Sequence, residues 1–236
     1  MVDQTTWFAL GGVGMLVGTL ALAAGFRLVP RSNWRRYSIL VAVPAIAVGA
    51  YAPMALGLGG VETQSGGTVF SLRYLDWLLT TPLHVLYLGL LAGAARRSIG
   101  QAIALMAMTI VLGFSGAVVS GVAGWGLFAL GGVAFLGVIY HTYADFAVAA
   151  GERDELTGAL YRKLRSFVVV LWLLYPVIWV LAPAGLGLLN VGTYVLVISY
   201  LDVVSKVGFG LIALSGQLAV SDAMATVEES TEATAD

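Results

Sequence analysis

The sequence predicts an all-α membrane protein, a bundle of seven transmembrane helices. Two observations support this fold class. The 236 residues are 59% hydrophobic and 11% charged, and their mean hydropathy of +0.92 is typical of chains that cross a lipid bilayer. In addition, seven stretches stay apolar over the roughly 20 residues that a spanning helix needs. We therefore expect a multi-pass protein of the cell membrane.

The helices are expected in order along the chain, separated by short breaks that contain glycine, proline or charged residues. They cover residues 4–26, 37–59, 70–92, 100–119, 125–150, 161–182 and 191–218. Together they define one transmembrane domain, residues 1–219. Residues 220–236 are acidic, small and polar, and we expect a disordered cytoplasmic tail there.

The basic residues predict the orientation of the bundle. All but two of the twelve Lys and Arg residues lie in or beside the first, third and fifth loops. They are Arg27, Arg31, Arg35, Arg36, Arg96, Arg97, Arg153, Arg162, Lys163 and Arg165. Because cytoplasmic loops of membrane proteins are enriched in Lys and Arg, we expect the N-terminus outside and the C-terminus inside.

Composition argues against several other classes of protein. The net charge of -1, without a basic patch, gives no sign of a nucleic-acid partner. The absence of cysteine excludes disulfides, thiolate catalysis and cysteine-based metal sites. The two histidines are far apart in the sequence, which argues against a metal site.

Four charged residues remain inside the expected helices. Arg73 and Asp76 share one face of the third helix, and Asp202 and Lys206 share one face of the seventh. Their formal charges sum to zero. One interpretation is a structural group of ion pairs that joins the two helices. The other is a functional site, because ionisable groups inside membranes usually face the bundle interior and mark function.

Lys206 favours the functional interpretation. An amine in an apolar span can attack an aldehyde, and the protonated Schiff base that results needs a carboxylate counterion. Asp76 and Asp202 can supply it, with Arg73 offsetting the second negative charge. A rival interpretation is an intramembrane aspartyl protease, in which two aspartates share a proton. The two neighbouring cations would keep both carboxylates ionised, so we do not expect an enzyme.

Two rows of side chains at helical spacing flank this lysine. They are Trp172, Tyr175, Pro176 and Trp179 on the sixth helix, and Trp77, Thr81 and His84 on the third. Taken alone, such a row indicates core packing. On both sides of a buried amine, flat rings predict a slot for a long, planar, apolar ligand.

Three segments that contain these residues resemble the microbial (type 1) rhodopsins: RYLDWLLTTP on the third helix, LWLLYPVIW on the sixth and YLDVVSKVGFG on the seventh. The resemblance covers the chain apart from the tail. It implies that retinal is bound to Lys206 as a protonated Schiff base. The retinal pocket that it implies is formed by Trp77, Thr81, Trp172, Pro176 and Trp179.

The resemblance also implies roles for the polar residues. Asp76 matches the primary counterion and proton acceptor, Asp202 the second counterion, and Arg73 the arginine below them. Tyr51 and Tyr175 match tyrosines that hydrogen-bond the second aspartate.

Other positions separate pumps from sensors in this family. Asp76 argues against a chloride pump, which carries a neutral residue there. Tyr87 stands where efficient proton pumps carry a carboxylic acid, and Asp145, the other inward acid, is expected at the interface, facing water or Arg165. No Asp or Glu occurs from residue 177 to residue 201. These absences predict a slow photocycle and weak pumping, which suits a sensor.

Within the family, the sequence resembles sensory rhodopsin II and the related middle rhodopsins. Tyr200 and Ser205 stand where sensory rhodopsin II has a tyrosine that contacts the transducer and a threonine that bonds the sixth-helix tyrosine. Ser205 keeps the hydroxyl of that threonine without its methyl group. The alternative for Tyr200 is an aromatic that lies at the membrane interface or faces lipid. His84 departs from the family, which usually has an apolar residue there. It is either a polar tuner or proton relay, or a neutral histidine bonded to a neighbour.

We therefore expect a retinal photoreceptor that signals to a membrane transducer for phototaxis. The alternative is a weak light-driven outward proton pump. The expected partners are the lipid bilayer and a two-helix transmembrane transducer, with a homo-oligomer left as an open alternative.

Overall fold

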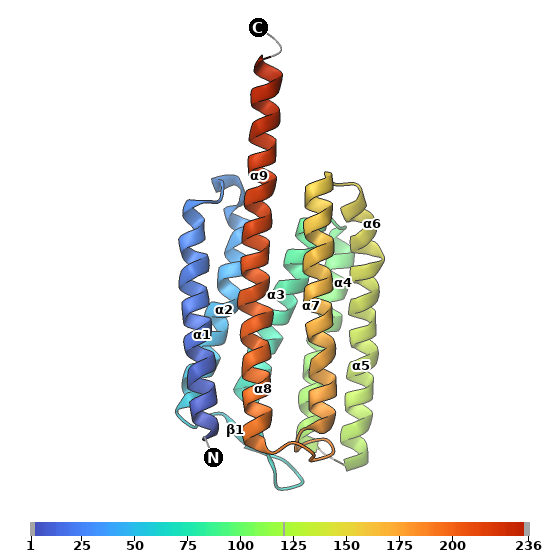
Figure 1. The fold of residues 1–236 in the computed structure, drawn as a ribbon. Coiled ribbons are helices and arrows are strands. Elements are labelled where there is room, and N and C mark those ends of the chain that lie inside the picture. The colour runs from blue at the N-terminus through green and yellow to red at the C-terminus, as the bar shows by residue number, and fades with distance from the viewer. Residues whose placement is uncertain (1–2, 120, 234–236) are drawn as a thin grey trace.

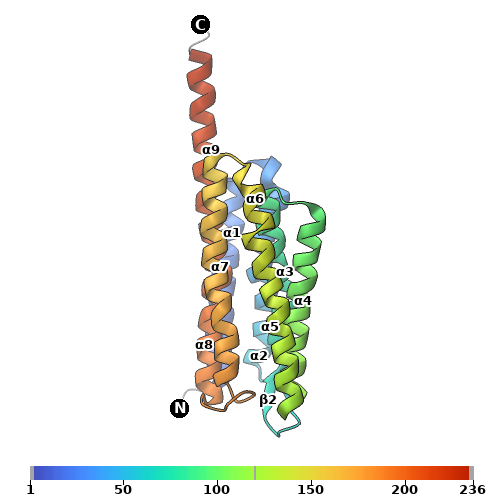
Figure 2. The same ribbon diagram turned by 90° about the vertical axis from the view of Figure 1, so that its right-hand side faces the viewer.

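The computed structural model of the protein describes residues 3–119 and 121–233, and long helices stand side by side in it (Figure 1, Figure 2). Seven helical segments of the described residues are long and apolar enough to cross a membrane. This confirms the predicted fold class. They are α1 (Gln4–Ala24), α2 (Trp34–Ala55), α3 (Ser71–Ala92), α4 (Arg96–Val119), α5 with α6 (Gly121–Tyr143, Asp145–Gly151), α7 (Glu155–Leu181) and α8 with α9 (Val191–Val203, Phe209–Ala233).

The chain starts at one end of the bundle and leaves it at the other, and we call these the N-terminal end and the C-terminal end (Figure 1). Two short 3₁₀ turns, Gly25–Arg27 and Arg31–Asn33, connect α1 to α2. Figure 1 shows α9 continuing far past the other helices at the C-terminal end. Helix α9 is thus continuous through residue 220, where the predicted tail begins. The division of the chain into a transmembrane domain and a tail stays a prediction.

Side-chain caps explain where two of the helices begin. The Asp154 carboxylate accepts a hydrogen bond from the Thr157 backbone N at 2.8 Å, so α7 starts at Glu155 and not at residue 161 as predicted. Hydrogen bonds from Thr157, the backbone one first, also hold the pKa of Asp154 below its usual range. Asn190 caps α8 in the same way, accepting from the Thr193 N at 2.9 Å.

Three local features were not predicted. Between α2 and α3, strands β1 (Gly60–Glu62) and β2 (Thr68–Phe70) form an antiparallel hairpin where the sequence predicts a loop, because three-residue strands are too short to show an alternating pattern. The fifth membrane span is interrupted between α5 and α6. The seventh contains a π-helical turn, η3 (Val204–Gly208), between α8 and α9. Such π turns occur often at functional sites.

The helices differ in how deeply they are buried. In α3, 61% of the most apolar window is buried inside the protein, against 22% in α4. Helix α3 is therefore central to the bundle and α4 lies at its rim. The charged residues of α3 accordingly face protein and not lipid.

Candidate functional site

Lys206 lies at the centre of the bundle, in the π-helical turn η3. Its side chain is 2% exposed, and its Nζ lies 2.6 Å from Asp76 Oδ2 on α3 and 3.6 Å from Asp202 Oδ1 on α8. The i,i+4 spacing of Asp202 and Lys206 and the central place of α3 bring the two carboxylates to one amine. A buried cation is stabilised when opposite charges surround it in this way.

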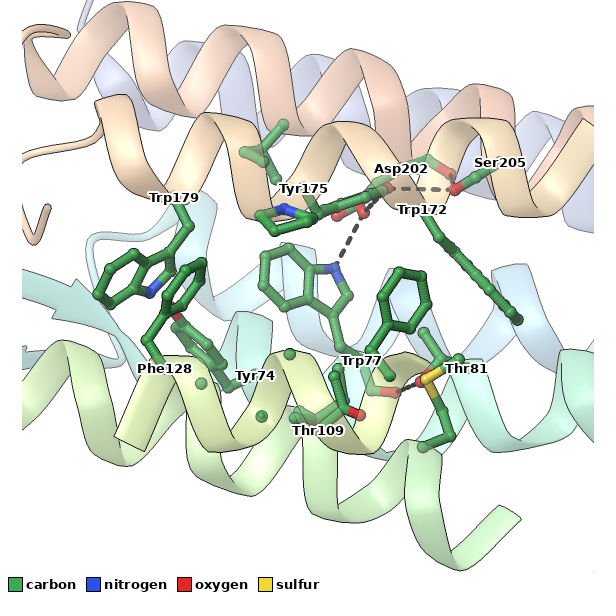
Figure 3. A pocket seen from close by; sticks show the side chains of 18 of the residues that line it. Tyr74, Trp77, Thr81, Thr109, Phe128, Trp172, Tyr175, Trp179, Asp202 and Ser205 are labelled. Carbon is green, nitrogen blue, oxygen red and sulfur yellow. Dashed lines mark hydrogen bonds between the residues drawn. The ribbon is translucent and has the colours of Figure 1, made fainter. Parts of the chain in front are cut away.

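Asp202 is held by hydrogen bonds from three other helices. Tyr51 donates to Oδ2 at 2.6 Å, while Trp77 Nε1 and the Tyr175 hydroxyl donate to Oδ1 at 3.0 Å and 2.7 Å. Figure 3 shows the Trp77 indole directed at this carboxylate. The Ser205 hydroxyl lies 3.2 Å from the Tyr175 hydroxyl. An ionised carboxylate is an acceptor, so these three donors satisfy both oxygens of Asp202.

Asp76 has fewer partners than Asp202. Its Oδ2 faces Lys206, and its Oδ1 has no hydrogen-bond partner among the described residues. The nearby Thr80 hydroxyl donates to the Asp76 backbone carbonyl at 2.7 Å and not to the carboxylate. Of the two aspartates, Asp76 therefore lies closer to Lys206 but has fewer hydrogen-bond partners, and one of its oxygens is without a partner among the described residues.

Arg73 lies nearer the N-terminal end than the aspartates and makes no ion pair within 4.0 Å in the described ranges. It is fully buried, and its guanidinium carbon lies 5.0 Å from the Phe8 ring centre, 5.3 Å from Tyr194 and 6.0 Å from Phe70. Such cation–π contacts stabilise a guanidinium that is withdrawn from water. The formal charges of the four residues sum to zero, but the ion pairs among them both involve Lys206. Arg73 is stabilised by aromatic rings instead.

A cavity of about 220 Å³ begins at Lys206 and extends between α3, α4, α5 and α7. All seven side chains of the two predicted rows line it, together with Asp202, Ser205 and Lys206. In Figure 3, Trp179, Phe128 and Tyr74 lie toward one end of this cavity, and Trp172 and Thr81 toward the other. Tyr51 lies outside the cavity and acts on it through Asp202.

One wall of the cavity was not predicted. It comes from α4 and α5 and includes Met106, Thr109, Ile110, Gly113, Phe128, Gly132 and Phe135. Phe128 stacks on Trp179 with ring centres 4.1 Å apart. A Cβ built on Gly113 or Gly132 would meet no atom within 4 Å, so packing does not fill the wall at these glycines. In the sequence these residues look like any lipid-facing apolar residues.

The chemistry of the cavity fits the retinal that the resemblance implies. The cavity offers an amine for an aldehyde, two carboxylates for the positive charge that follows, and flat apolar walls for a polyene. Trp77 and Trp172 reach it from α3 and α7, and the Thr81 hydroxyl is bonded to the Trp77 carbonyl at 2.8 Å. Lys206 would hold the group, and the aromatic residues would orient it.

Toward the C-terminal end the bundle is mostly apolar. The His84 ring lies edge-on to Phe209 at 4.7 Å and to Trp172 at 6.2 Å. Further along α3, Tyr87 is fully buried and accepts a hydrogen bond from Gln217 Nε2 at 2.6 Å. We had not predicted a partner for Tyr87, because a single glutamine near the end of the last helix resembles an interfacial residue.

The two remaining candidates lie away from the cavity. Tyr200 is 68% exposed on α8, so its ring faces the surroundings of the bundle. Asp145 starts α6 and accepts hydrogen bonds from Ser98 at 2.5 Å and from His141 at 2.8 Å. Of the two surroundings expected for Asp145, water or Arg165, its 38% exposed side chain fits the first, and Arg165 lies over the Tyr143 ring instead.

Comparisons with known proteins point in one direction. Residues 3–220 match the family model for bacteriorhodopsin-like protein. The chain is 51% identical to sensory rhodopsin-2 of Haloarcula vallismortis over 100% of both chains. It is 47% identical to sensory rhodopsin-2 of Natronomonas pharaonis over 91% of this chain and 89% of that one. The solved thermophilic rhodopsin from Rubrobacter xylanophilus superposes with a TM-score of 0.89 at 35% identity, covering 93% of this chain and 98% of the other.

Proposed function

This chain belongs to the bacteriorhodopsin-like family, and we propose that it is a sensory photoreceptor that holds retinal on Lys206 and passes a light signal to a membrane transducer. The observation that carries the proposal is the buried Lys206 amine, 2.6 Å from Asp76 at the wall of an aromatic cavity. The similarity to two sensory rhodopsins supports the sensory part.

Retinal bound at this site supplies a light-driven isomerisation. The residues of the chain then direct one proton. Lys206 holds it on its nitrogen, and Asp76 is the acceptor because one of its oxygens has no other partner. Asp202 stays charged among its three donors, and with Arg73 it keeps the site neutral after the transfer. The proton thereby moves toward the N-terminal end of the bundle.

The signal leaves through the contact between α7 and α8. Tyr175 on α7 hydrogen-bonds both Asp202 and, in η3, Ser205, so a change at Lys206 alters the link between the two helices. Tyr200 lies on the exposed side of α8, two residues before Asp202. A transducer helix packed there would sense a shift of α8 directly. We infer that such a two-helix transducer is the partner in the lipid bilayer.

The test is reconstitution followed by a signalling measurement. Purified protein with added retinal should form a visible pigment, and light should change the activity of a kinase coupled to a co-expressed two-helix transducer. A control with the transducer deleted should lose the light response and keep the pigment. A pigment that cycles without altering any co-expressed transducer would contradict the sensory proposal.

A second function, weak light-driven outward proton pumping, is supported by the same Asp76–Lys206 contact. It needs a rapid proton return from the C-terminal end, where Tyr87 stands in place of an acid. Illuminated vesicles should therefore show little acidification. Sustained acidification at a high turnover, without a transducer, would put the pump first.

A further inference from the structure

One titratable side chain in the cavity wall has no part in the proton transfer described above. His84 is 2% exposed and lines the cavity with Lys206. Its Nδ1 lies 3.1 Å from the Thr80 backbone carbonyl, and its Nε2 has no hydrogen-bond partner among the described residues. A buried polar atom without a partner is costly and calls for an explanation. The neutral histidine bonded to a neighbour, one of our two predictions, accounts for only one of the two ring nitrogens.

The Thr80 contact fixes which nitrogen of His84 carries the proton. A backbone carbonyl can only accept, so the neutral ring must donate from Nδ1. The Nε2 lone pair is then free inside the cavity. The Ser205 backbone, directly before Lys206, also interacts with the ring. A proton can therefore be added at Nε2 without breaking the Nδ1 bond to Thr80.

On α3, Arg73 comes before Asp76 and His84 after it, so along the bundle they lie on opposite sides of the contact between Asp76 and Lys206. His84 comes two turns after Asp76, about 12 Å closer to the C-terminal end. Phe209 packs against the His84 ring at 4.7 Å and against the Tyr87 ring at 5.6 Å, so it separates the histidine from the Tyr87–Gln217 pair. Among the described side chains that line the cavity, His84 is thus the titratable one placed between Lys206 and the C-terminal end.

We propose that Nε2 of His84 carries the proton that returns to the Lys206 nitrogen from the C-terminal end. This inference rests on the proposed function. First, a proton from the aqueous phase binds the Nε2 lone pair and gives an imidazolium. Then the Nε2–H bond breaks, the lone pair of the neutral Lys206 nitrogen takes the proton, and the ring returns to its neutral form with Nδ1–H unchanged. No oxidant or reductant is needed.

The charges around His84 set the order of these steps. Lys206 on η3 is the charged group that acts on the ring, while α7 and α9 present the uncharged rings of Trp172 and Phe209. While Lys206 is positive, a second cation beside it is disfavoured. Once the Lys206 proton has moved to Asp76, this repulsion ends and His84 can take up a proton. The relay therefore works only after light has acted, and in the dark the positive charge of Lys206 opposes proton uptake by His84.

The decisive measurement is the decay of the light-induced state in which the Lys206 nitrogen is neutral, followed by flash absorption in the retinal-loaded protein. His84→Gln keeps a polar side chain that cannot become a cation. We expect it to slow the decay by about 100-fold, the lower end of what a positioned acid–base group contributes. Azide, a small diffusible weak acid, should restore the rate. Tyr87→Phe is the matched control, because it removes a hydroxyl beyond Phe209 and keeps the ring.

A second readout does not depend on the photocycle. The chain has two histidines, so ¹⁵N-histidine spectra of the His141→Gln variant report His84 alone. We expect a neutral ring protonated at Nδ1 in the dark. The inference is overturned by a dark ring protonated at Nε2, by a His84→Gln decay within twofold of the unaltered protein, or by a slowing that azide does not reverse. Absence of any pigment in the unaltered protein would instead refute the proposed function.

Discussion

The bundle has two unlike halves, one on each side of Lys206. Toward the N-terminal end, Asp76 contacts the amine and Asp202 accepts from residues of three other helices. Toward the C-terminal end, the His84 ring packs against Phe209, and beyond them Gln217 donates a hydrogen bond to Tyr87. The first half therefore places a carboxylate against the amine, whereas in the second half His84 is the titratable side chain of the cavity wall and apolar Phe209 lies beyond it.

This difference shows how one scaffold can favour signalling over transport. Removing a proton from Lys206 needs a nearby anion, and Asp76 is in contact. Returning it from the far side needs a donor, and a buried phenol bonded to an amide is a poor one. The state in which the Lys206 nitrogen is neutral is then expected to last, which would give a partner helix time to respond. The predictions that follow alter one half at a time.

The largest effect is expected when Lys206, the boundary between the halves, is removed. Lys206→Ala should leave a folded protein that forms no visible pigment with retinal, because no other Lys lines the cavity. Absorption spectra after adding retinal measure this. Lys163→Ala, at an exposed position on α7, is the control and should retain full colour. A covalent pigment in Lys206→Ala would rule out attachment at this amine.

The polar half is tested by changing each aspartate in turn. Asp76→Asn should shift absorption to the red, because an anion beside the Lys206 nitrogen stabilises the ground state more than the excited state. It should also suppress the state with a neutral Lys206 nitrogen. Asp202→Asn should shift the colour too but retain that state, since Asp76 remains as acceptor. Equal suppression in both variants would mean that the two carboxylates act as one acceptor.

The apolar half is tested by supplying the missing acid. Tyr87→Asp should speed the decay of the neutral-nitrogen state by about 100-fold, the effect of a positioned proton donor, and increase light-driven acidification outside vesicles. Tyr87→Asn has nearly the same shape without the acid and serves as the control. If the unaltered protein already recovers quickly, the contrast between the halves does not control the cycle.

The charged centre of the site could be predicted from the sequence, and its setting could not. Lys206, Asp76 and Asp202 stand out because ionisable residues are rare within apolar spans. The aromatic cage around Arg73 was missed although Phe70 precedes the arginine by only three residues, because the other two rings, Phe8 and Tyr194, come from distant parts of the chain. Phe8 and Tyr194 have no regular spacing to the arginine in the sequence, and one nearby phenylalanine does not indicate a cage.

The same physical reason explains the unpredicted cavity wall. Helices α4 and α5 carry apolar residues on the lipid side as well as on the cavity side, so no pattern separates Phe128 or Gly113 from residues that face lipid. The seven spans were easier to predict, since a bilayer imposes a fixed length on each of them. The π-helical turn at Lys206 depends on packing between helices and leaves no local signal in the sequence.

A smaller effect is expected where the polar half meets α7. Ser205→Ala removes the hydroxyl that lies 3.2 Å from Tyr175. A neutral hydrogen bond contributes about 1 kcal/mol, so the balance between dark and signalling states should change about fivefold. Binding of a transducer should persist while the light response of its kinase weakens. Ser205→Thr keeps the hydroxyl and should behave like the unaltered protein.

The smallest effect is expected at the outer surface, at Tyr200. This residue is 68% exposed and lies on α8 close to Asp202, so it can pass a shift of the helix to a partner without touching the cavity. Inside lipid, one hydrogen bond between helices is worth roughly 0.6 kcal/mol, and Tyr200→Val should therefore weaken transducer binding only about threefold. The pigment colour should not change, because Tyr200 does not line the cavity.

Tyr140→Val is the matched control, since Tyr140 is 63% exposed on α5, away from α8. Titration of the purified receptor with transducer in lipid nanodiscs measures both affinities. Equal affinities in the two variants would mean that the partner docks elsewhere on the bundle, and the signal would then have to leave by a route other than α8.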